Sequence, residues 1–156
     1  MRKLIIAPVK NSTAVPTESW LDLEDLAVVE VTSEESSHPI ESVFVPDAAG
    51  WRAATPGTQT IRLVFDKPQR ISRIWLLFED AEHTRTQEFV LRWSSDQRET
   101  FREIVRQQWN FSQPDSTREI ENYKVDLPNV SVLELIVVPD NRGGEARASV
   151  QKFLLA

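Results

Sequence analysis

The sequence predicts an all-β fold, a jelly-roll β-sandwich of about eight antiparallel strands. Short segments in which apolar and polar residues alternate recur along the chain, and such alternation is typical of half-buried strands. Residues that favour turns separate these segments at the spacing expected of a sandwich. Nine prolines in 156 residues, and few stretches with helical periodicity, argue against a helical bundle. The length fits one domain with a sizeable hydrophobic core.

The N-terminal part contains one ambiguous segment and one clear strand. Residues 19–26 interleave apolar and acidic side chains, a pattern that fits either a helical turn or an irregular sheet edge. Residues 28–32 are rich in valine and are predicted to form a strand, which a polar loop to Pro39 follows. We expect residues 1–27 to form an extension packed on the sandwich and residues 28–156 to form the domain itself.

The rest of the chain carries the strongest strand signals. Residues 59–66 alternate between apolar and polar side chains, and Pro68 then predicts a turn over 66–69. Residues 71–78 are apolar on both faces, which is typical of a central, doubly covered strand. Further strands are expected over 88–93, 101–109, 119–127, 132–138 and 148–155, with turns at 95–98 and 128–129 and a loop over 139–144.

Composition narrows the classes of function. A formal net charge of −6 and a pI near 5.0 argue against nucleic acid as the ligand, because non-specific phosphate binding needs a basic surface. The chain has no cysteine, which excludes disulfides, thiolate catalysis and cysteine-based metal sites. The basic start resembles a signal peptide, but its apolar run ends early at Pro8 and no stretch approaches the roughly 20 apolar residues of a membrane span. We expect a soluble, cytoplasmic protein.

Catalytic motifs are missing from the sequence. It contains no nucleophile elbow, no phosphate-binding glycine loop and no His-Glu-x-x-His helix. The adjacent carboxyls of Glu34–Glu35 and Glu79–Asp80 would point to opposite faces of a strand, so neither pair converges on a substrate. We therefore predict no catalytic residues and a protein that is not an enzyme.

Several segments, in a fixed order, resemble a discoidin domain of the factor V/VIII type C, galactose-binding-like family. The resemblance covers roughly Val28 to Leu155. The segments that carry it are the loop Gly50–Ala54 with Trp51, the strand 59–63, Pro68, the strand 71–74, the hairpin 88–96 with Phe101 and Ile104 after it, and the last strand 148–150.

The resemblance implies a jelly-roll sandwich that binds its ligand through loops at one end. Members of the family include carbohydrate-binding, lipid-binding and protein-interaction modules. The segment Trp51–Ala54, with Gly57, Thr60 and Ile61, also resembles the N-terminal domain of the X-ray repair cross-complementing scaffold protein, which implies an association with broken DNA. The leading hypothesis is a non-catalytic carbohydrate-binding module. The alternatives are an intracellular protein-interaction or scaffold module and a module that binds damaged or nicked DNA.

Calcium is the cofactor that the resemblance suggests, and this sequence departs from the calcium-binding members in two places. Lys152 stands where those members usually carry an acidic residue. The loop 46–50 before the tryptophan has Asp47 as its one carboxylate, whereas calcium takes six or more oxygen ligands. We therefore expect no cofactor, with Asp47 as the one candidate ligand if calcium is bound.

The segment 108–113 is the best candidate for a ligand site. Trp109 and Phe111 offer flat apolar faces, and Asn110 and Gln113 offer the adaptable donors and acceptors that carbohydrate sites use. The alternative is a long loop that these two aromatic residues fold over the mouth of the barrel.

Trp51, Arg52 and Arg85 complete the predicted ligand-binding set. A loop tryptophan can stack on a sugar and an arginine can donate several hydrogen bonds, although the large apolar area of Trp51 favours burial at the end of the sandwich. Arg85 ends the segment 79–85, which holds three carboxylates and His83 and is best interpreted as a solvated acidic loop. Nothing in the sequence pairs His83 with His38.

Arginines on the predicted strands include Arg92, Arg102 and Arg106. They could share a solvent-facing surface that attracts anions or a DNA backbone. Interspersed glutamates such as Glu99, Glu103 and Glu119 favour cross-strand ion pairs instead.

Overall fold

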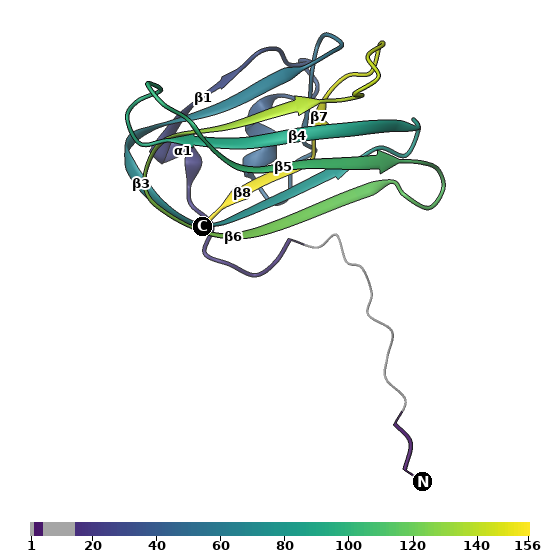
Figure 1. The fold of residues 1–156 in the computed structure, drawn as a ribbon, viewed down its shortest axis with the longest axis horizontal. Coiled ribbons are helices and arrows are strands. Elements are labelled where there is room, and N and C mark those ends of the chain that lie inside the picture. Colours follow the sequence, from purple (N-terminus) through teal and green to yellow (C-terminus); the bar gives the residue numbers. More distant parts are fainter. Residues whose placement is uncertain (1, 5–14) are drawn as a thin grey trace.

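The computed structural model describes residues 2–4 and 15–156. Residues 1 and 5–14, with most of the apolar run before Pro8 and part of the expected extension, lie outside the described residues. The predicted all-β sandwich is confirmed (Figure 1). Its elements are α1 (Leu23–Leu26), β1 (Ala27–Val31), η1 (Ile40–Phe44), β2 (Trp51–Arg52), β3 (Gln59–Glu79), β4 (Arg85–Ser94), β5 (Arg102–Phe111), β6 (Arg118–Val138), β7 (Ser149–Val150) and β8 (Lys152–Leu155).

Two long strands, β3 and β6, build the sandwich because each belongs to both of its sheets. Sheet I contains β1, the first half of β3, the second half of β6, β4 and β5, in that order. Sheet II contains β8, the second half of β3 and the first half of β6. The strands β2 and β7 pair with each other apart from both sheets. The loops that follow β3, β5 and β6 gather at one end, on the right of Figure 1.

The turns predicted at 66–69 and 128–129 are wrong, because β3 and β6 continue through both prolines. The ladder between these strands shifts register between Val64 and Gln69, and Gln69 pairs with Val130. A proline cannot donate a ladder hydrogen bond, so it is tolerated where pairing is irregular. Pro68 and Pro128 therefore lie where the two long strands bend. The turn expected at 95–98 is confirmed, with Gln97 (φ 57°) in the left-handed region.

The hydrophobic core lies between the two sheets. Alternate residues of the first part of β3, from Gln59 to Phe65, face inward, and residues 74–78 are all buried, whereas residues 66–70 between them are not; buried residues of β4 face them from sheet I. Phe78 and Phe89 stack across the core with ring centroids 5.2 Å apart. Fully buried side chains from both sheets include Ile61, Leu63, Ile74, Leu76, Leu91, Leu133 and Phe153.

The outer face of sheet II is also covered, as the apolar pattern of 71–78 predicts. Trp75, Leu77 and Leu154 form a second apolar cluster, and Val15 and Trp20 pack against it. The backbone N–H of Leu21 donates to the carbonyl of Leu155 at 2.8 Å, and Arg73 lies over the Trp20 ring at 5.3 Å. The segment before β1 thus contacts the sheet, and residues 23–26 form the helical turn that the sequence left open.

The outer face of sheet I holds a buried carboxylate between two arginines. Glu134 on β6 is 1% exposed and pairs in register with Arg62 of β3 and Arg92 of β4. The Nε of Arg62 donates to one carboxylate oxygen at 2.8 Å, and the Nε of Arg92 donates to the other at 2.9 Å. Cross-strand pairing, rather than a free basic surface, is therefore the role of these arginines.

A second buried carboxyl, Glu119, lies near the start of β6 and faces the interior. It is fully buried, and its Oε1 accepts a hydrogen bond from the Gln87 side chain at 3.0 Å. Among the described residues, its Oε2 makes no hydrogen bond, and the indole nitrogen of Trp109 is likewise buried without an acceptor. Burial, together with the Glu121 carboxyl, raises the pKa of Glu119 to about 8. This carboxyl therefore holds a proton at neutral pH.

Among residues 2–4 and 15–156, no helix has the length and apolar character needed to cross a membrane.

Candidate ligand-binding pocket at one end of the sandwich

An open pocket of about 550 Å³ is lined by residues of the loops that follow β3 and β6. These loops lie at the right-hand end of the sandwich in Figure 1. The walls of the pocket come from stretches far apart in the sequence: His38, residues 49–52, residues 79–85, and a segment between Asp140 and Gln151. Three arginines, two histidines and five carboxylates line it. The pocket thus presents many hydrogen-bond donors and acceptors in a concave site, which is how ligand orientation is fixed in binding sites.

One wall of the pocket is organised around Glu35, which lies beside it. The carboxylate of Glu35 accepts a hydrogen bond from Arg147 at 3.0 Å, and Arg52 and His38 lie at 3.6 and 3.5 Å. Backbone bonds fix the same wall, because the N–H of Glu35 donates to the carbonyl of Arg52. Arg52, Arg147 and His38 remain 39–47% exposed, so their free nitrogens can also reach a ligand.

The opposite wall is organised around Asp80. Its carboxylate accepts hydrogen bonds from the backbone N–H groups of Glu82 and His83 and, at 2.7 Å, from the Nε of Arg85. Burial raises the pKa of Asp80, but these hydrogen bonds outweigh it and hold the pKa below its ordinary value. Asp80 therefore stays ionised and holds the 79–85 loop in one conformation.

Arg85 is a structural member of this wall rather than part of a solvated loop. It is the first residue of β4, 3% exposed, and donates to the Gln87 side chain and to the carbonyl of Pro139 at 2.7 Å. Its guanidinium lies 4.6 Å from the centre of the Phe111 ring. The interpretation of 79–85 as a freely solvated loop is thus wrong for Asp80 and Arg85.

Trp51 is buried at the base of the pocket, as the alternative interpretation of the sequence held. It is 1% exposed, and its indole N–H donates to the carbonyl of Ser33 at 2.9 Å. A ring buried in this way offers no stacking face to a ligand. Arg52, the next residue, lies on the opposite face of the strand and is exposed.

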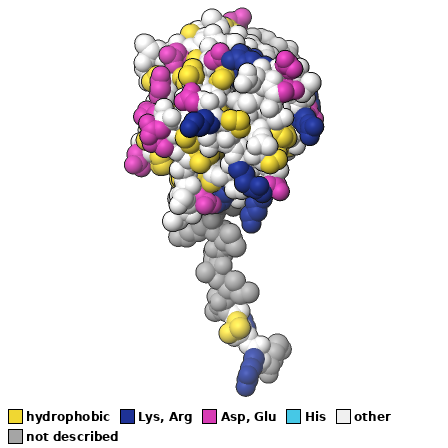
Figure 2. Space-filling view, turned by 90° about the vertical axis from the view of Figure 1, so that its left-hand side faces the viewer, with side chains coloured by type: hydrophobic (Ala, Val, Ile, Leu, Met, Phe, Trp, Pro, Cys, Tyr) yellow, Lys and Arg dark blue, Asp and Glu magenta, His cyan; other side chains and the backbone are white. Residues whose placement is uncertain are grey.

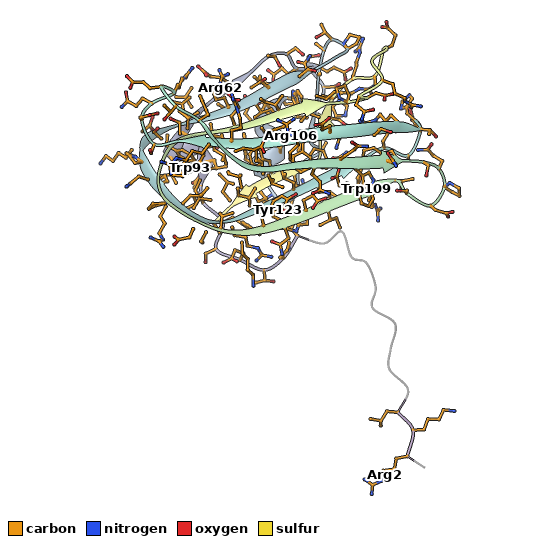
Figure 3. All side chains as sticks on the ribbon, in the orientation of Figure 1. Arg2, Arg62, Trp93, Arg106, Trp109 and Tyr123 are labelled. Atoms are coloured by element: carbon orange, nitrogen blue, oxygen red, sulfur yellow. The ribbon has the colours of Figure 1, made fainter. Side chains whose placement is uncertain are left out.

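The segment 108–113 is not the loop that the sequence predicted, because β5 continues to Phe111. Phe111 is fully buried beneath Arg85, and Trp109 packs partly buried against the core. Asn110 accepts a hydrogen bond from the hydroxyl of Thr86 on the adjacent strand. None of these residues lines the pocket, and Figure 3 places Trp109 along β5 instead.

Gln113 supports the pocket from behind. Its side-chain amide donates to the carbonyls of Asp80 and His83, at 3.1 and 2.9 Å, and so ties the loop after β5 to the 79–85 loop. Sequence reasoning included Gln113 as a ligand contact. The structure gives it bonds within the protein.

Sequence reasoning missed several residues that shape the pocket, chiefly His38, Asp80, His83 and Arg147. The pocket brings His38 and His83 together although 44 residues separate them. Only the pairing of β2 with β7 and the bend of β3 create this proximity, and neither leaves a local sequence signal. The one available clue to these residues was that each has a polar side chain and lies in a loop that the sequence places at an end of the sandwich.

The loop that the sequence singled out for calcium contacts a cation that belongs to the protein. The Lys152 ammonium donates to the carbonyl of Val45 at 3.1 Å and to that of Ala48, so two of the backbone oxygens are already bound by a cation. Asp47 is the one carboxylate of this loop, and the described residues contain no group of three or more residues suited to holding a metal. Calcium would need six or more oxygen ligands.

Comparison with known proteins supports the fold. No family model and no curated protein matches the sequence. Among solved structures, the chain is similar to a family 32 carbohydrate-binding module of NanJ from Clostridium perfringens in complex with galactose. The identity is 13%, with 87% of this chain and 96% of the module covered and a TM-score of 0.61.

Two further structures show the same likeness. The family 32 module of AlyQ, in complex with 4,5-unsaturated mannuronic acid, is 12% identical over 89% of this chain and 98% of the module, with a TM-score of 0.61. A pectin-binding carbohydrate-binding module is 16% identical over 83% of this chain and 89% of that chain, with a TM-score of 0.58. At these identities the likeness establishes the galactose-binding-like fold of this chain.

Proposed function

We propose that this protein is a non-catalytic carbohydrate-binding module that takes its ligand in the end pocket. The observation that carries the proposal is the pocket itself: an open site of about 550 Å³ lined by charged and polar side chains. A sugar presents hydroxyls that each donate and accept hydrogen bonds, so it needs a wall of both donors and acceptors. Arg52, Arg147 and His38 supply donors, and the carboxylates across the pocket supply acceptors.

The fold likeness supports this choice of ligand class. The three similar structures described above are carbohydrate-binding modules. Two are complexes with galactose or 4,5-unsaturated mannuronic acid, and the third is pectin-binding. Because a fold alone does not determine function, the proposal depends on the pocket residues of this chain.

The surface charges favour a sugar over nucleic acid. The arginines of the sheet I strands are engaged, since Arg106 donates to Glu88 and Glu103 and Arg102 lies over the Trp93 ring at 5.8 Å. Arg62 and Arg106 lie on different strands of this sheet in Figure 3. Figure 2 presents the end of the sandwich opposite to the pocket, on the left of Figure 1, and there too acidic and basic side chains are interspersed with hydrophobic ones. A phosphate backbone needs a basic stripe instead.

Binding of a panel of sugars tests the proposal. Galactose, N-acetylgalactosamine, and galacturonate and mannuronate oligomers are titrated by calorimetry into the wild-type protein and into Arg147→Ala. We expect saturable binding of at least one sugar and a loss of about tenfold in affinity in the variant, because a charged hydrogen bond is removed.

Two matched variants locate the site. Arg106→Ala removes a more exposed, ion-paired arginine from the outer face of sheet I and should leave the affinity unchanged. Trp109→Phe tests the site that the sequence first suggested. If Trp109→Phe abolishes binding while Arg147→Ala does not, the ligand lies at β5 and the pocket assignment is wrong. No binding across the panel would contradict the function and leave a protein partner as the next hypothesis.

A further inference from the structure

The loop that leads into the pocket wall is held by a lysine of the last strand. Residues 45–49 follow η1, and Lys152 on β8 lies beneath them at 7% exposure. Its ammonium donates to the carbonyls of Val45 and Ala48. Two carbonyls of one short loop therefore converge on a single cation that belongs to the protein.

The electrostatic surroundings suit a cation at this point. Burial lowers the pKa of the Lys152 ammonium, and the carboxylates of Asp47 and Glu79 offset part of that effect by favouring the charged form. Carbonyl oxygens and a carboxylate are the ligands that a hard metal ion also prefers. A metal ion here would have to displace the ammonium, which occupies the oxygens it needs.

The lysine-bound loop continues directly into the pocket. Gly50 has φ +98°, and a Cβ at that position would lie 2.6 Å from the Gln151 side chain and 2.8 Å from the carbonyl of Val150. The chain then enters β2, where Trp51 pairs with Val150 and Arg52 with Ser149. A shift of the 45–49 loop would thus move Arg52, one of the exposed donors of the wall.

We propose that the Lys152 ammonium is the resident cation of the 45–49 loop, does the structural work of a bound metal ion there, and thereby positions the Arg52 wall of the pocket. The loop is therefore ordered without calcium. The role of Lys152 in ligand binding rests on the proposed function, whereas its role in ordering the loop does not.

The first experiment uses the wild-type protein, so it does not depend on any variant folding. Melting temperature and amide hydrogen exchange are measured in millimolar calcium chloride and in EDTA. We expect both to be the same in the two conditions. An increase in melting temperature with calcium, together with slower exchange at residues 48–53, would show a metal site and overturn the proposal.

The second experiment removes the charge of Lys152 but keeps most of its length. In Lys152→Met we expect hydrogen exchange about tenfold faster at the N–H groups of Ala48, Arg52 and Ala53, which donate to Val45, His38 and Ala148. The N–H of Gln97, which donates to Ser131, reports on a distant loop and should not change. Lys152→Arg keeps a cation with several donors and should recover most of the protection.

Lys67→Met is the matched control, because Lys67 is an exposed lysine on β3. Unchanged exchange at Ala48 and Arg52 in Lys152→Met would overturn the proposal, as would an equal effect of Lys67→Met. A sugar that binds the wild type should bind Lys152→Met about tenfold more weakly. If no sugar binds at all, the exchange and calcium results still decide the role of Lys152.

Discussion

Two buried glutamates on the same strand are accommodated in opposite ways. Glu134 and Glu119 both lie on β6 and are 1% and 0% exposed. Glu134 has an arginine on each neighbouring strand and bonds to both. Glu119 accepts a hydrogen bond from the uncharged Gln87 side chain, and the Glu121 carboxyl beside it disfavours its charged form. One is stabilised as an anion by cations, and the other by keeping its proton.

The difference follows from where each residue lies in the sheets. Glu134 is in the half of β6 that has β3 on one side and β4 on the other, so two cross-strand neighbours can be basic. Glu119 is in the other half, which pairs with β3 alone and faces the interior. Burial of a charge is costly unless it is paired. Arg85 favours the charged form of Glu119 through its charge alone, and burial and the Glu121 carboxyl outweigh it, so Glu119 keeps its proton.

Removal of the paired carboxylate should have the largest effect. We expect Glu134→Ala to lower the free energy of unfolding by about 3–4 kcal/mol, because on a partly buried face Arg92 loses its carboxylate partner and Arg62 keeps only Glu30. Urea denaturation at pH 7 measures it. Arg70→Ala breaks an exposed pair with Asp126 and should cost under about 1 kcal/mol. Equal losses of unfolding free energy in Glu134→Ala and Arg70→Ala would contradict the idea that the buried Glu134 carboxylate is stabilised by its arginines more than an exposed ion pair is.

Replacement of the protonated carboxyl should stabilise the protein at alkaline pH. The pKa of Glu119 is raised to about 8 in the folded state from an ordinary value of 4.5. The protonated carboxyl therefore contributes fully to the free energy of unfolding below pH 4.5, and this contribution is lost as the pH rises toward 8. Glu119→Gln keeps a side chain that can accept from Gln87 without this penalty. At pH 8 we expect a gain of a few kcal/mol over the wild type, and almost none at pH 4.5.

Urea denaturation of both proteins between pH 4.5 and pH 8 measures this difference. A gap between Glu119→Gln and the wild type that stays constant with pH would contradict a raised pKa. The variant Glu103→Gln, at an exposed position of β5, is the control and should follow the wild type.

Removal of one of the two cations should have a smaller effect than removal of the carboxylate. In Arg92→Met, Glu134 keeps its bond to Arg62. The variant also loses the contact between the Arg92 guanidinium and the Phe101 ring, at 4.5 Å. We expect a loss of about 1–2 kcal/mol by urea denaturation. A double-mutant cycle with Glu134→Ala should show coupling; strict additivity would mean that the two side chains do not interact.

The smallest effect is expected beside Glu119. The Tyr123 hydroxyl donates to Glu121 at 3.2 Å, and Figure 3 shows Tyr123 on β6. Burial, with the Glu121 carboxylate, raises the pKa of Tyr123 above its ordinary value, so the hydroxyl stays a donor. Tyr123→Phe should cost about 0.5–1 kcal/mol at pH 7. A loss as large as that of Glu134→Ala would show that the Tyr123–Glu121 hydrogen bond contributes as much to stability as the ion pairs of Glu134.

Most strands of the fold could be predicted from local sequence patterns, but the bend of the two long strands could not. Alternation identified the strands over 59–66 and 88–93, because a half-buried strand needs a period of two, and apolar runs identified the covered strands over 71–78 and 132–138. Pro68 and Pro128 were misinterpreted as turns, since a proline signals a turn and a bend in a long strand equally well. The positions of Glu119 and Glu134 within the two sheets depend on that bend, which no local pattern shows.

The candidate site was less predictable than the fold. Arg52 was identified from its place beside a loop tryptophan, and burial of Trp51 was foreseen from its size. The segment 108–113 was mistaken for a loop because its polar and aromatic residues fit a ligand site and a strand equally well. Asp80 and Arg147 could not be found, because the pocket joins residues whose proximity is created by strand pairing alone.

The bend shared by β3 and β6 also constrains how the chain folds. Gln59 pairs with Val137 at one end of the ladder, and Glu79 pairs with Arg118 at the other, so every rung closes a long loop. Contacts between such distant residues form slowly, because the entropy of loop closure is lost before the pairing is gained. Since both sheets need this one ladder, neither can be completed before it forms. We expect folding on a timescale of roughly milliseconds to seconds, in one cooperative step in which the two sheets appear together.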